Sequence, residues 1–202
     1  MQIVCLDLEG VLIPEIWIQF AQKTGIDGFT RTTRDEPDYD KLMQYRLALL
    51  REHDLKMADI QSVISTMAPL PGAVEFLKGL RETYQVVILS DTFYPFSAPM
   101  MRQLDWPTLF CHELDVDSDG TVANYRLRMP DQKRAAVRAF KQLNFTVIAA
   151  GDSYNDTAML DEADAGFFIF PPESIVREFP QFPVMQSHVE LRAAIDESVA
   201  RL

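Results

Sequence analysis

Residues 3–10 of the chain read IVCLDLEG, an apolar run that leads directly into two acidic residues and a glycine. An apolar run without alternation is typical of a strand covered on both faces, as in a parallel sheet. Asp7 and Glu9 would then lie at the carboxyl end of that strand, where open parallel sheets bind their ligands. Gly10 permits a sharp turn that lets both acids face one crevice.

Similar patterns recur along the rest of the chain. Further apolar runs predict strands at residues 86–89, 147–150 and 166–170. Helical patterns lie between them, at residues 71–80, 131–143 and 187–199. Strands that alternate with helices predict an α/β fold with a doubly wound, mainly parallel sheet. Residues 115–126, with Asp119-Gly120 at the turn, predict a β-hairpin.

Residues 14–69 break this alternation. They contain helical patterns at residues 15–24, 39–53 and 57–67 and no clear strand. We interpret this segment as a small helical cap inserted after the first strand, over the crevice of the sheet. The α/β core would then comprise residues 1–13 and 70–202.

The composition restricts the class of protein. Nineteen Lys and Arg residues against thirty Asp and Glu residues give a formal net charge of −11 in 202 residues. This acidity argues against nucleic acid and anionic membrane as partners. Cys5 and Cys111 lie in apolar runs, so we expect buried free thiols and a cytoplasmic protein. We expect no signal peptide and no membrane-spanning segment. The acidic excess is either a solvated surface or, in part, a cation site.

Acidic residues follow two of the predicted strands. Asp7 could attack a phosphomonoester to form an acyl phosphate, with Glu9 as the general acid and base. The alternative, a solvated turn with two exposed acids, fits that motif equally well. Asp152 and Asp156 follow the strand at 147–150 and could complete an oxygen-lined magnesium site with Asp7. A helix N-cap explains one of these acids well but four converging acids poorly.

Two further residues could bind a phosphate group. Ser90 offers a hydroxyl beside backbone N–H groups at the end of the second strand. Lys133 lies at the start of a predicted helix, where its ammonium could reach the same crevice and balance the clustered acids. A solvated lysine is the simpler interpretation, although a lysine in the first turn opposes the helix dipole.

Together these motifs resemble the haloacid dehalogenase superfamily of phosphotransferases. They occur in order, as Asp7-x-Glu9-Gly10, Ser90, Lys133 and Gly151-Asp152-x-x-x-Asp156. The resemblance implies that Asp7 is the nucleophile, Glu9 the acid and base, and Ser90 and Lys133 the phosphate binders. It also implies that Asp7, the backbone carbonyl of Glu9 and Asp152 hold Mg²⁺. Asp156 would support that site.

The nearer resemblance is to the phosphoserine phosphatases, with a helical cap after the first motif. Glu15 and Arg46 match the positions that bind the amino and carboxylate groups of phosphoserine. Arg46 also lies on the apolar stripe of its predicted helix, where a guanidinium favours an anion, unless it only snorkels at the edge. Asn155 and Asp91 are the remaining candidates for contact with substrate or phosphate.

Two departures from that pattern concern the acceptor. Glu9 stands where these phosphatases usually carry Asp, and Asp91-Thr92 stand where they carry small residues. Both departures resemble a bacterial variant that also passes the phosphoryl group from phosphoserine to homoserine. Two alternatives stay open: a phosphatase of the same mechanism for another small phosphomonoester, and a non-catalytic module that keeps the acidic cluster as a cation site. A homodimer is also left open.

Overall fold

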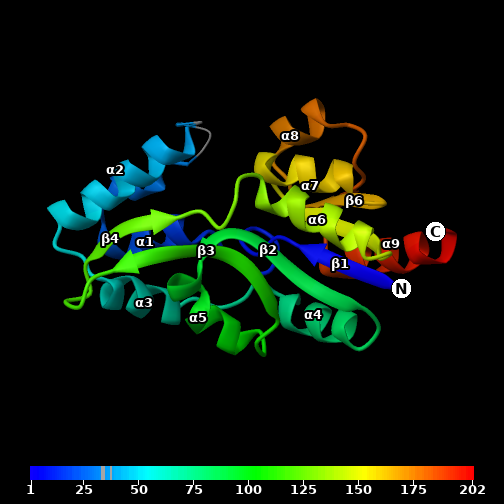
Figure 1. Ribbon diagram of the computed structural model, residues 1–202, viewed down its shortest axis with the longest axis horizontal. Coiled ribbons are helices and arrows are strands. Elements are labelled where there is room, and N and C mark those ends of the chain that lie inside the picture. Colours follow the sequence, from blue (N-terminus) through cyan, green and yellow to red (C-terminus); the bar gives the residue numbers. More distant parts are fainter. Residues whose placement is uncertain (33–34, 37) are drawn as a thin grey trace.

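A seven-stranded sheet runs through the computed structural model, which describes residues 1–32, 35–36 and 38–202 (Figure 1). Its strands are β1 (Gln2–Leu6), β2 (Gln85–Phe93), β3 (Thr108–Val116), β4 (Val122–Arg126), β5 (Thr146–Gly151), β6 (Ala165–Ile169) and β7 (Val184–Met185). The strand order is β4-β3-β2-β1-β5-β6-β7, and only the β3–β4 pair is antiparallel. The predicted α/β fold with a mainly parallel sheet is confirmed, and so is the β-hairpin.

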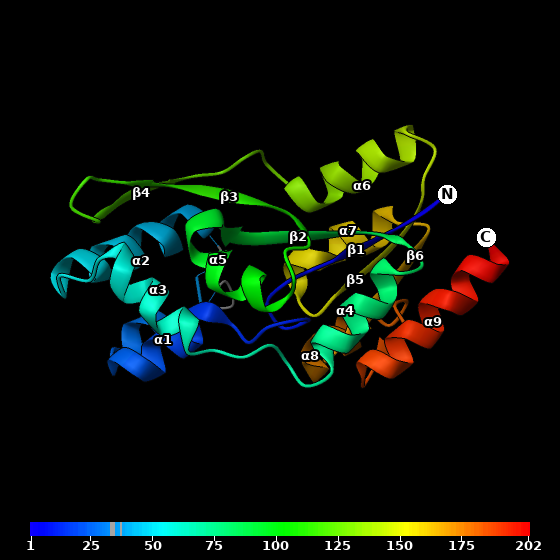
Figure 2. The same cartoon turned by 90° about the horizontal axis from the view of Figure 1, so that it is seen from below.

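Helices cover both faces of the sheet. Helices α4 (Ala73–Arg81) and α9 (His188–Arg201) lie on one face, and α6 (Gln132–Gln142) lies on the other (Figure 2). The side chains of β1 divide between two apolar clusters: Val4 and Leu6 pack with α4 and α9, whereas Ile3 and Cys5 pack with α6 and α7 (Thr157–Glu162). This double burial explains why the strand is apolar without alternation.

The segment 14–69 is helical throughout its regular part. Its described elements are α1 (Ile16–Thr24), the 3₁₀ helix η1 (Asp27–Thr30), α2 (Tyr39–Glu52) and α3 (Met57–Ser65). The three predicted helices are therefore present. Trp17 and Phe29 stack inside the segment, and Trp17 meets Phe96 of α5 (Tyr94–Gln103) edge to face. Because its apolar residues join the cluster on one sheet face, the boundaries of a separate cap domain stay a prediction.

The second strand is longer than the sequence indicated. We expected it to end before Ser90, but β2 continues to Phe93, so Ser90 and Asp91 lie within it. The pairing with β1 ends at Ile88, and the pairing with β3 shifts register between Leu89 and Phe93. One edge of this irregular stretch is therefore free of β1, which is why polar residues occur there.

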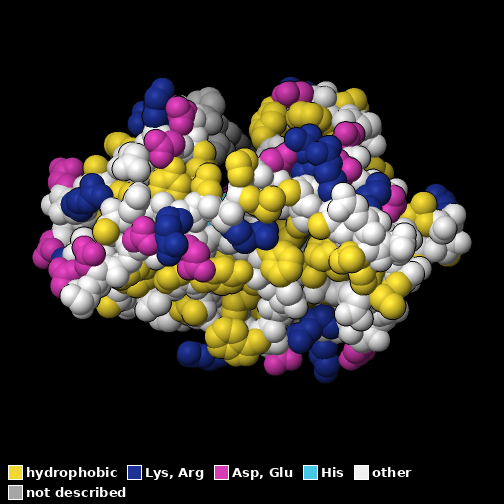
Figure 3. All heavy atoms as spheres, viewed as in Figure 1, with side chains coloured by type: hydrophobic (Ala, Val, Ile, Leu, Met, Phe, Trp, Pro, Cys, Tyr) yellow, Lys and Arg dark blue, Asp and Glu magenta, His cyan; other side chains and the backbone are white. Residues whose placement is uncertain are grey.

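The surface and the thiols agree with the expectations from composition. Basic and acidic side chains are interspersed on the face that Figure 3 shows, so no field of one sign dominates it. Cys5 and Cys111 are buried free thiols. Within the described part of the chain, no helix has both the length and the apolar character needed to cross a bilayer.

Candidate active site

The carboxyl ends of β1, β2 and β5 meet at one edge of the sheet. Asp7 directly follows β1, and its N–H donates to Ala150 of β5 across 3.0 Å. A cavity of about 410 Å³ opens there. Its lining includes most of the residues predicted from the sequence: Asp7, Glu9, Glu15, Arg46, Ser90, Asp91, Asp152 and Asn155. Figure 3 shows the surface hollowed between the side of α2 and the side of α7 and α8 (Glu173–Glu178).

Lys133 connects the acids at this edge of the sheet, although it lines a neighbouring cavity and not the one just described. It lies in the first turn of α6 and is 3% exposed, and its Nζ is 2.9 Å from Asp7 Oδ1 and 2.8 Å from Asp156 Oδ1. Asp91 Oδ2 lies 3.7 Å away. Burial alone would lower the pKa of Lys133, but Asp156, Asp7 and Asp91 together raise it well above its ordinary value. The ammonium therefore stays charged.

Asp156 braces the loop after β5. Its Oδ2 accepts from the backbone N–H groups of Asp152 (2.9 Å) and Ser153 (3.1 Å), while its Oδ1 accepts from Lys133. A Cβ on Gly151 would lie within 2.4 Å of this carboxylate, so the glycine is required for the close approach. With both oxygens engaged by protein donors, Asp156 supports the site rather than faces its ligand.

Asp7 and Asp152 present oxygens that suit a hard cation. One oxygen each from Asp7, Asp152 and Asp156 lies within 4.8 Å of the others. Among the described residues, buried Asp152 Oδ1 has no hydrogen-bond partner. Burial and Asp156 raise the pKa of Asp152 to about 7, and a bound cation would relieve this repulsion. The donors are all oxygens, as a divalent cation such as Mg²⁺ requires.

Gly10 lets the first motif approach that cation position. Its φ of +78° lies in the left-handed region, and a Cβ there would be 2.4 Å from the Asp152 carboxylate. The turn therefore depends on glycine for both backbone conformation and space. It brings the backbone after Asp7 against the loop after β5.

Arg46 lines the same cavity from helix α2. We call the end of the cavity at Arg46 its roof and the end at Asp7 its floor. Arg46 is 7% exposed, its Nη2 donates to the Arg31 carbonyl at 2.8 Å, and its guanidinium lies 4.7 Å from the centre of the Trp17 ring. Its buried Nε has no partner among the described residues. Burial lowers the pKa of Arg46 to about 10, so it stays charged at neutral pH. A carboxylate in the cavity would satisfy that charge.

Glu9 and Glu15 lie together between the floor and the roof. Glu9 Oε2 accepts from the backbone N–H of Ile16 at 2.8 Å. Burial and the nearby Glu15 carboxylate raise the pKa of Glu9 to about 8. Glu9 can therefore carry a proton near neutral pH, as a general acid must. Glu15 is exposed at the start of α1 and offers a carboxylate at the cavity mouth.

Asp91 is fixed by three further side chains as well as by Lys133. Its Oδ2 accepts from Asn155 Nδ2 at 2.8 Å, and its Oδ1 lies 3.2 Å from Gln132 Nε2 and 3.4 Å from His112 Nε2. Burial alone would raise the pKa of Asp91. The positive charge of Lys133, and to a lesser degree the hydrogen bonds from the neighbouring side chains, lower it below its ordinary value. Asp91 is thus a permanent anion beside the cavity, and it orients Lys133 and Asn155.

Several residues of the site gave no signal in the sequence. Gln132 also donates to the Ser90 carbonyl at 2.8 Å, and the Tyr39 hydroxyl donates to the Asp91 carbonyl at 3.2 Å. Gln132 directly precedes Lys133, so its position in the same helical turn could have indicated it. For Tyr39 and His112 no motif or spacing indicated a role, because their contacts join segments far apart in the chain.

Comparisons with known proteins agree with this geometry. The family model of the haloacid dehalogenase-like hydrolases matches residues 1–164. A Pseudomonas aeruginosa protein named phosphoserine phosphatase ThrH is 62% identical over 192 residues, which cover 95% of this chain and 94% of that one. An Archaeoglobus fulgidus phosphoserine phosphatase is 24% identical over 179 residues, 82% of this chain and 51% of the other.

Solved structures show the same fold. A phospho-aspartyl intermediate analogue of phosphoserine phosphatase superposes with a TM-score of 0.78 at 18% identity, covering 97% of this chain and 98% of that chain. A substrate-bound phosphoserine phosphatase gives a TM-score of 0.77 at 17% identity, with 97% of each chain covered. With the motifs at the strand ends and a family match over most of its length, the chain belongs to the haloacid dehalogenase-like hydrolases.

Proposed function

We propose that this enzyme is a magnesium-dependent phosphoserine phosphatase that also transfers the phosphoryl group to homoserine. The observation that carries the proposal is one cavity with two ends: Asp7, which is paired with Lys133 behind it, at its floor and the buried, partly unsatisfied guanidinium of Arg46 at its roof. A phosphate at the floor and an amino-acid carboxylate at the roof suit these two charges. The relative from P. aeruginosa, which bears the name phosphoserine phosphatase ThrH, supports this substrate.

The first half-reaction transfers the phosphoryl group to the enzyme. An oxygen of the Asp7 carboxylate attacks phosphorus, and the bond between phosphorus and the serine oxygen breaks. Glu9, whose raised pKa lets it hold a proton, protonates the departing serine oxygen. Lys133 and the hydroxyl and backbone N–H groups around Ser90 bind the equatorial phosphate oxygens. The product is an aspartyl phosphate on Asp7.

The second half-reaction releases the phosphoryl group. Glu9, now deprotonated, accepts a proton from water or from the homoserine hydroxyl as that oxygen attacks phosphorus. The acyl phosphate bond breaks and the Asp7 carboxylate is restored. Water gives inorganic phosphate, and homoserine gives its phosphate ester. Lys133 remains paired with Asp156 throughout and keeps the floor of the cavity electrostatically balanced.

A magnesium ion fits the acidic end of this cavity. Asp7, Asp152 and the backbone carbonyl of Glu9 would hold it, with Asp156 behind them, as the unpartnered Asp152 Oδ1 suggests. When bound, it supplies positive charge that offsets the repulsion between the carboxylates and the incoming phosphate. Without such a cation, burial and the repulsion between these carboxylates raise the pKa values of Asp7 and Asp152.

The direct test follows both products from one donor. Purified enzyme is incubated with phosphoserine and Mg²⁺, with and without homoserine, and inorganic phosphate and homoserine phosphate are quantified. We expect phosphate in both cases and homoserine phosphate in the second. A panel of sugar and cofactor phosphates runs in parallel. Higher kcat/KM on one of those esters would contradict the assignment of the donor, and a lack of homoserine phosphate would contradict the acceptor.

A further inference from the structure

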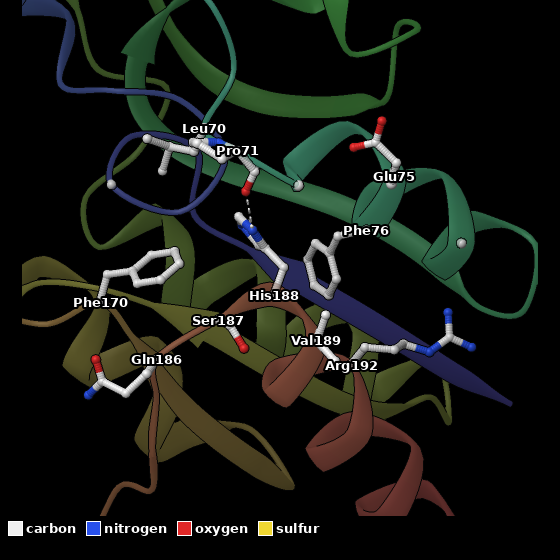
Figure 4. Close-up of a pocket in the computed structure, with 13 residues that line it drawn as sticks. Leu70, Pro71, Glu75, Phe76, Phe170, Gln186, Ser187, His188, Val189 and Arg192 are labelled. Carbon is white, nitrogen blue, oxygen red and sulfur yellow. Dashed lines mark hydrogen bonds between the residues drawn. The ribbon is translucent and has the colours of Figure 1, made fainter.

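His188, the first residue of α9, lies within hydrogen-bond distance of two separate stretches of backbone. Its Nε2 is 2.8 Å from the Val11 carbonyl oxygen, and its Nδ1 is 3.2 Å from the Pro71 carbonyl oxygen. Figure 4 shows the ring pointing toward Pro71, with Phe76 alongside. Because carbonyl oxygens only accept, the imidazole must donate, and a neutral ring with a single N–H donates to one of these two carbonyls at a time.

Val11 and Pro71 belong to the two linkers that join the helical segment to the sheet. We define them as residues 11–14, where the chain leaves the sheet, and residues 69–72, where it returns. The Leu70 N–H donates to the Leu12 carbonyl at 2.9 Å, so the linkers also bond to each other. His188 brings helix α9 into contact with these two linkers, and α9 is itself packed on the sheet through Leu191 and Ile195. One side chain of the core thus contacts both linkers, with the shorter contact to the outgoing one.

The outgoing linker continues the loop that carries the acid and base. The Gly10 N–H donates to the Ile13 carbonyl at 2.8 Å, and Glu9 forms a bridge with Ile13. A bond to the Val11 carbonyl therefore fixes a short, internally bonded turn rather than a free segment. Movement of Val11 would move the Glu9 carboxylate and the Glu9 backbone carbonyl that the proposed function assigns to the cation.

The ring itself is firmly placed. His188 is 6% exposed, and its ring centre lies 5.0 Å from that of Phe76 and 5.4 Å from that of Phe170. A cavity of about 920 Å³ borders it, lined by apolar side chains such as Phe76 and Phe170 together with polar ones such as Glu75 (Figure 4). This cavity is larger than the catalytic one and lies on the other side of the first-motif turn, with Gly10 in its lining.

We propose that His188 is a positioning residue for phosphoryl transfer, acting on the loop of Glu9 through the Val11 carbonyl, the shorter of its two contacts. The proposal rests on the proposed function only where activity on phosphoserine is measured; the measurement of hydrogen exchange is independent of the substrate. Because His188 is remote from the substrate groups that Arg46 and Ser90 would bind, its loss should reduce kcat more than it changes KM.

The neighbouring cavity makes a chemical rescue possible. His188→Gly removes the imidazole and leaves an opening of that shape beside a cavity that free imidazole can enter. Val189→Gly is the matched control, because it places the same helix-weakening glycine one residue later, on a side chain that is 79% exposed. Activity with phosphoserine and Mg²⁺ is measured for both variants with and without millimolar imidazole.

We expect kcat of His188→Gly to fall about tenfold and imidazole to restore most of it, with saturation, since small misplacements of catalytic groups cost about this much or more. Wild-type enzyme and Val189→Gly should not respond to imidazole. Undiminished kcat in His188→Gly, or a loss that imidazole does not reverse in a folded variant, would overturn the proposal.

Hydrogen exchange provides a readout that does not depend on the reaction. In His188→Gly, the amides of residues 9–13 and those of Leu70 and Gly72 should exchange faster than in Val189→Gly, and imidazole should restore their protection. Equal exchange in both variants would overturn the proposal even if phosphoserine were not the substrate. Wild-type enzyme that is inactive on phosphoserine would instead contradict the proposed function.

Discussion

Lys133 shows most clearly how single residues build this site. A buried ammonium is costly unless it is paired, and here it contacts Asp7 and Asp156 at hydrogen-bond distance. The pairing keeps Lys133 charged and keeps two neighbouring carboxylates from facing each other alone. Lys133, for which a solvated surface position was the alternative in the sequence, is therefore one of the most buried charges of the described chain.

Arg46→Lys tests the carboxylate end of the cavity. A lysine ammonium keeps the charge but cannot bind a carboxylate in the bidentate manner of a guanidinium. We expect KM for phosphoserine to rise about tenfold or more, with kcat within several-fold of wild type. Arg51→Lys is the control, because Arg51 lies on the same helix but donates to Ala123 on an exposed surface. Equal KM values in the two variants would show that Arg46 does not bind the substrate carboxylate.

Mg²⁺ binding should depend on pH through Asp152. Its pKa of about 7 means that the carboxyl is protonated at lower pH, and protons then compete with the cation. We therefore expect the affinity for Mg²⁺ to fall about tenfold or more between pH 8 and pH 6. Isothermal titration calorimetry measures this directly. An affinity that stays constant over this interval would show that Asp152 is not a ligand.

Glu9→Asp should change the fate of the aspartyl phosphate. The shorter side chain retracts the carboxylate and leaves more room beside the phosphoryl group, and water is the smallest acceptor that can fill it. We expect the ratio of inorganic phosphate to homoserine phosphate to rise severalfold, about 1 kcal/mol in relative barrier. The ratio is read from both products in one reaction. A ratio equal to that of wild type would leave the Glu in this motif without a role in acceptor choice.

At the scale of elements, the site depends on a bond between α2 and β2. The Tyr39 hydroxyl at the start of α2 donates to the Asp91 carbonyl in β2. Tyr39, Asp91 and Asn155 line both the catalytic cavity and a neighbouring cavity of about 850 Å³. These three residues therefore form the partition between the two spaces.

Tyr39→Phe should open that partition. The ring remains, but the bond to the Asp91 carbonyl is lost, at a net cost of about 1 kcal/mol. We expect water to reach the aspartyl phosphate more often, so the share of phosphoryl groups passed to homoserine should fall about threefold or more. Tyr125→Phe is the control, since Tyr125 also bonds to α2, through Asp40, but away from the catalytic cavity. The same shift in both variants would assign the effect to general loosening.

The elements near the site were predictable to different degrees. The strands at 3–6 and 147–150 and the acids after them could be predicted, because parallel strands present their carboxyl ends at one edge. Helix α5 could not, because Pro95 and Pro99 indicate interruption, although Pro95 occupies the first turn and the helix tolerates Pro99. The continuation of β2 through Ser90 was missed because a register shift leaves no pattern in the sequence.

For the whole molecule, the apolar and helical patterns of the sequence were sufficient to predict the fold, but they predicted only part of the candidate site. The motif residues could be placed from the chain alone: Asp7, Glu9, Ser90 and Asp152 line one cavity, and Lys133 and Asp156 pair with each other beside it. The partners that orient them could not, because Tyr39, His112 and His188 act across contacts between distant segments. Neither periodicity nor spacing encodes such contacts. The net charge of −11 likewise reflects mostly dispersed surface acids, with only a few at the site.

The central claim is that Asp7 carries the phosphoryl group. The most direct measurement mixes the enzyme with phosphoserine and Mg²⁺, quenches the reaction in acid within milliseconds, and locates the added phosphoryl group by peptide mass spectrometry. We expect it on Asp7 in the wild-type enzyme and nowhere in Asp7→Asn, with turnover of that variant reduced about 10⁴-fold or more. A phosphoryl group on another residue, or an Asp7→Asn variant that turns over at a rate near wild type, would contradict the account.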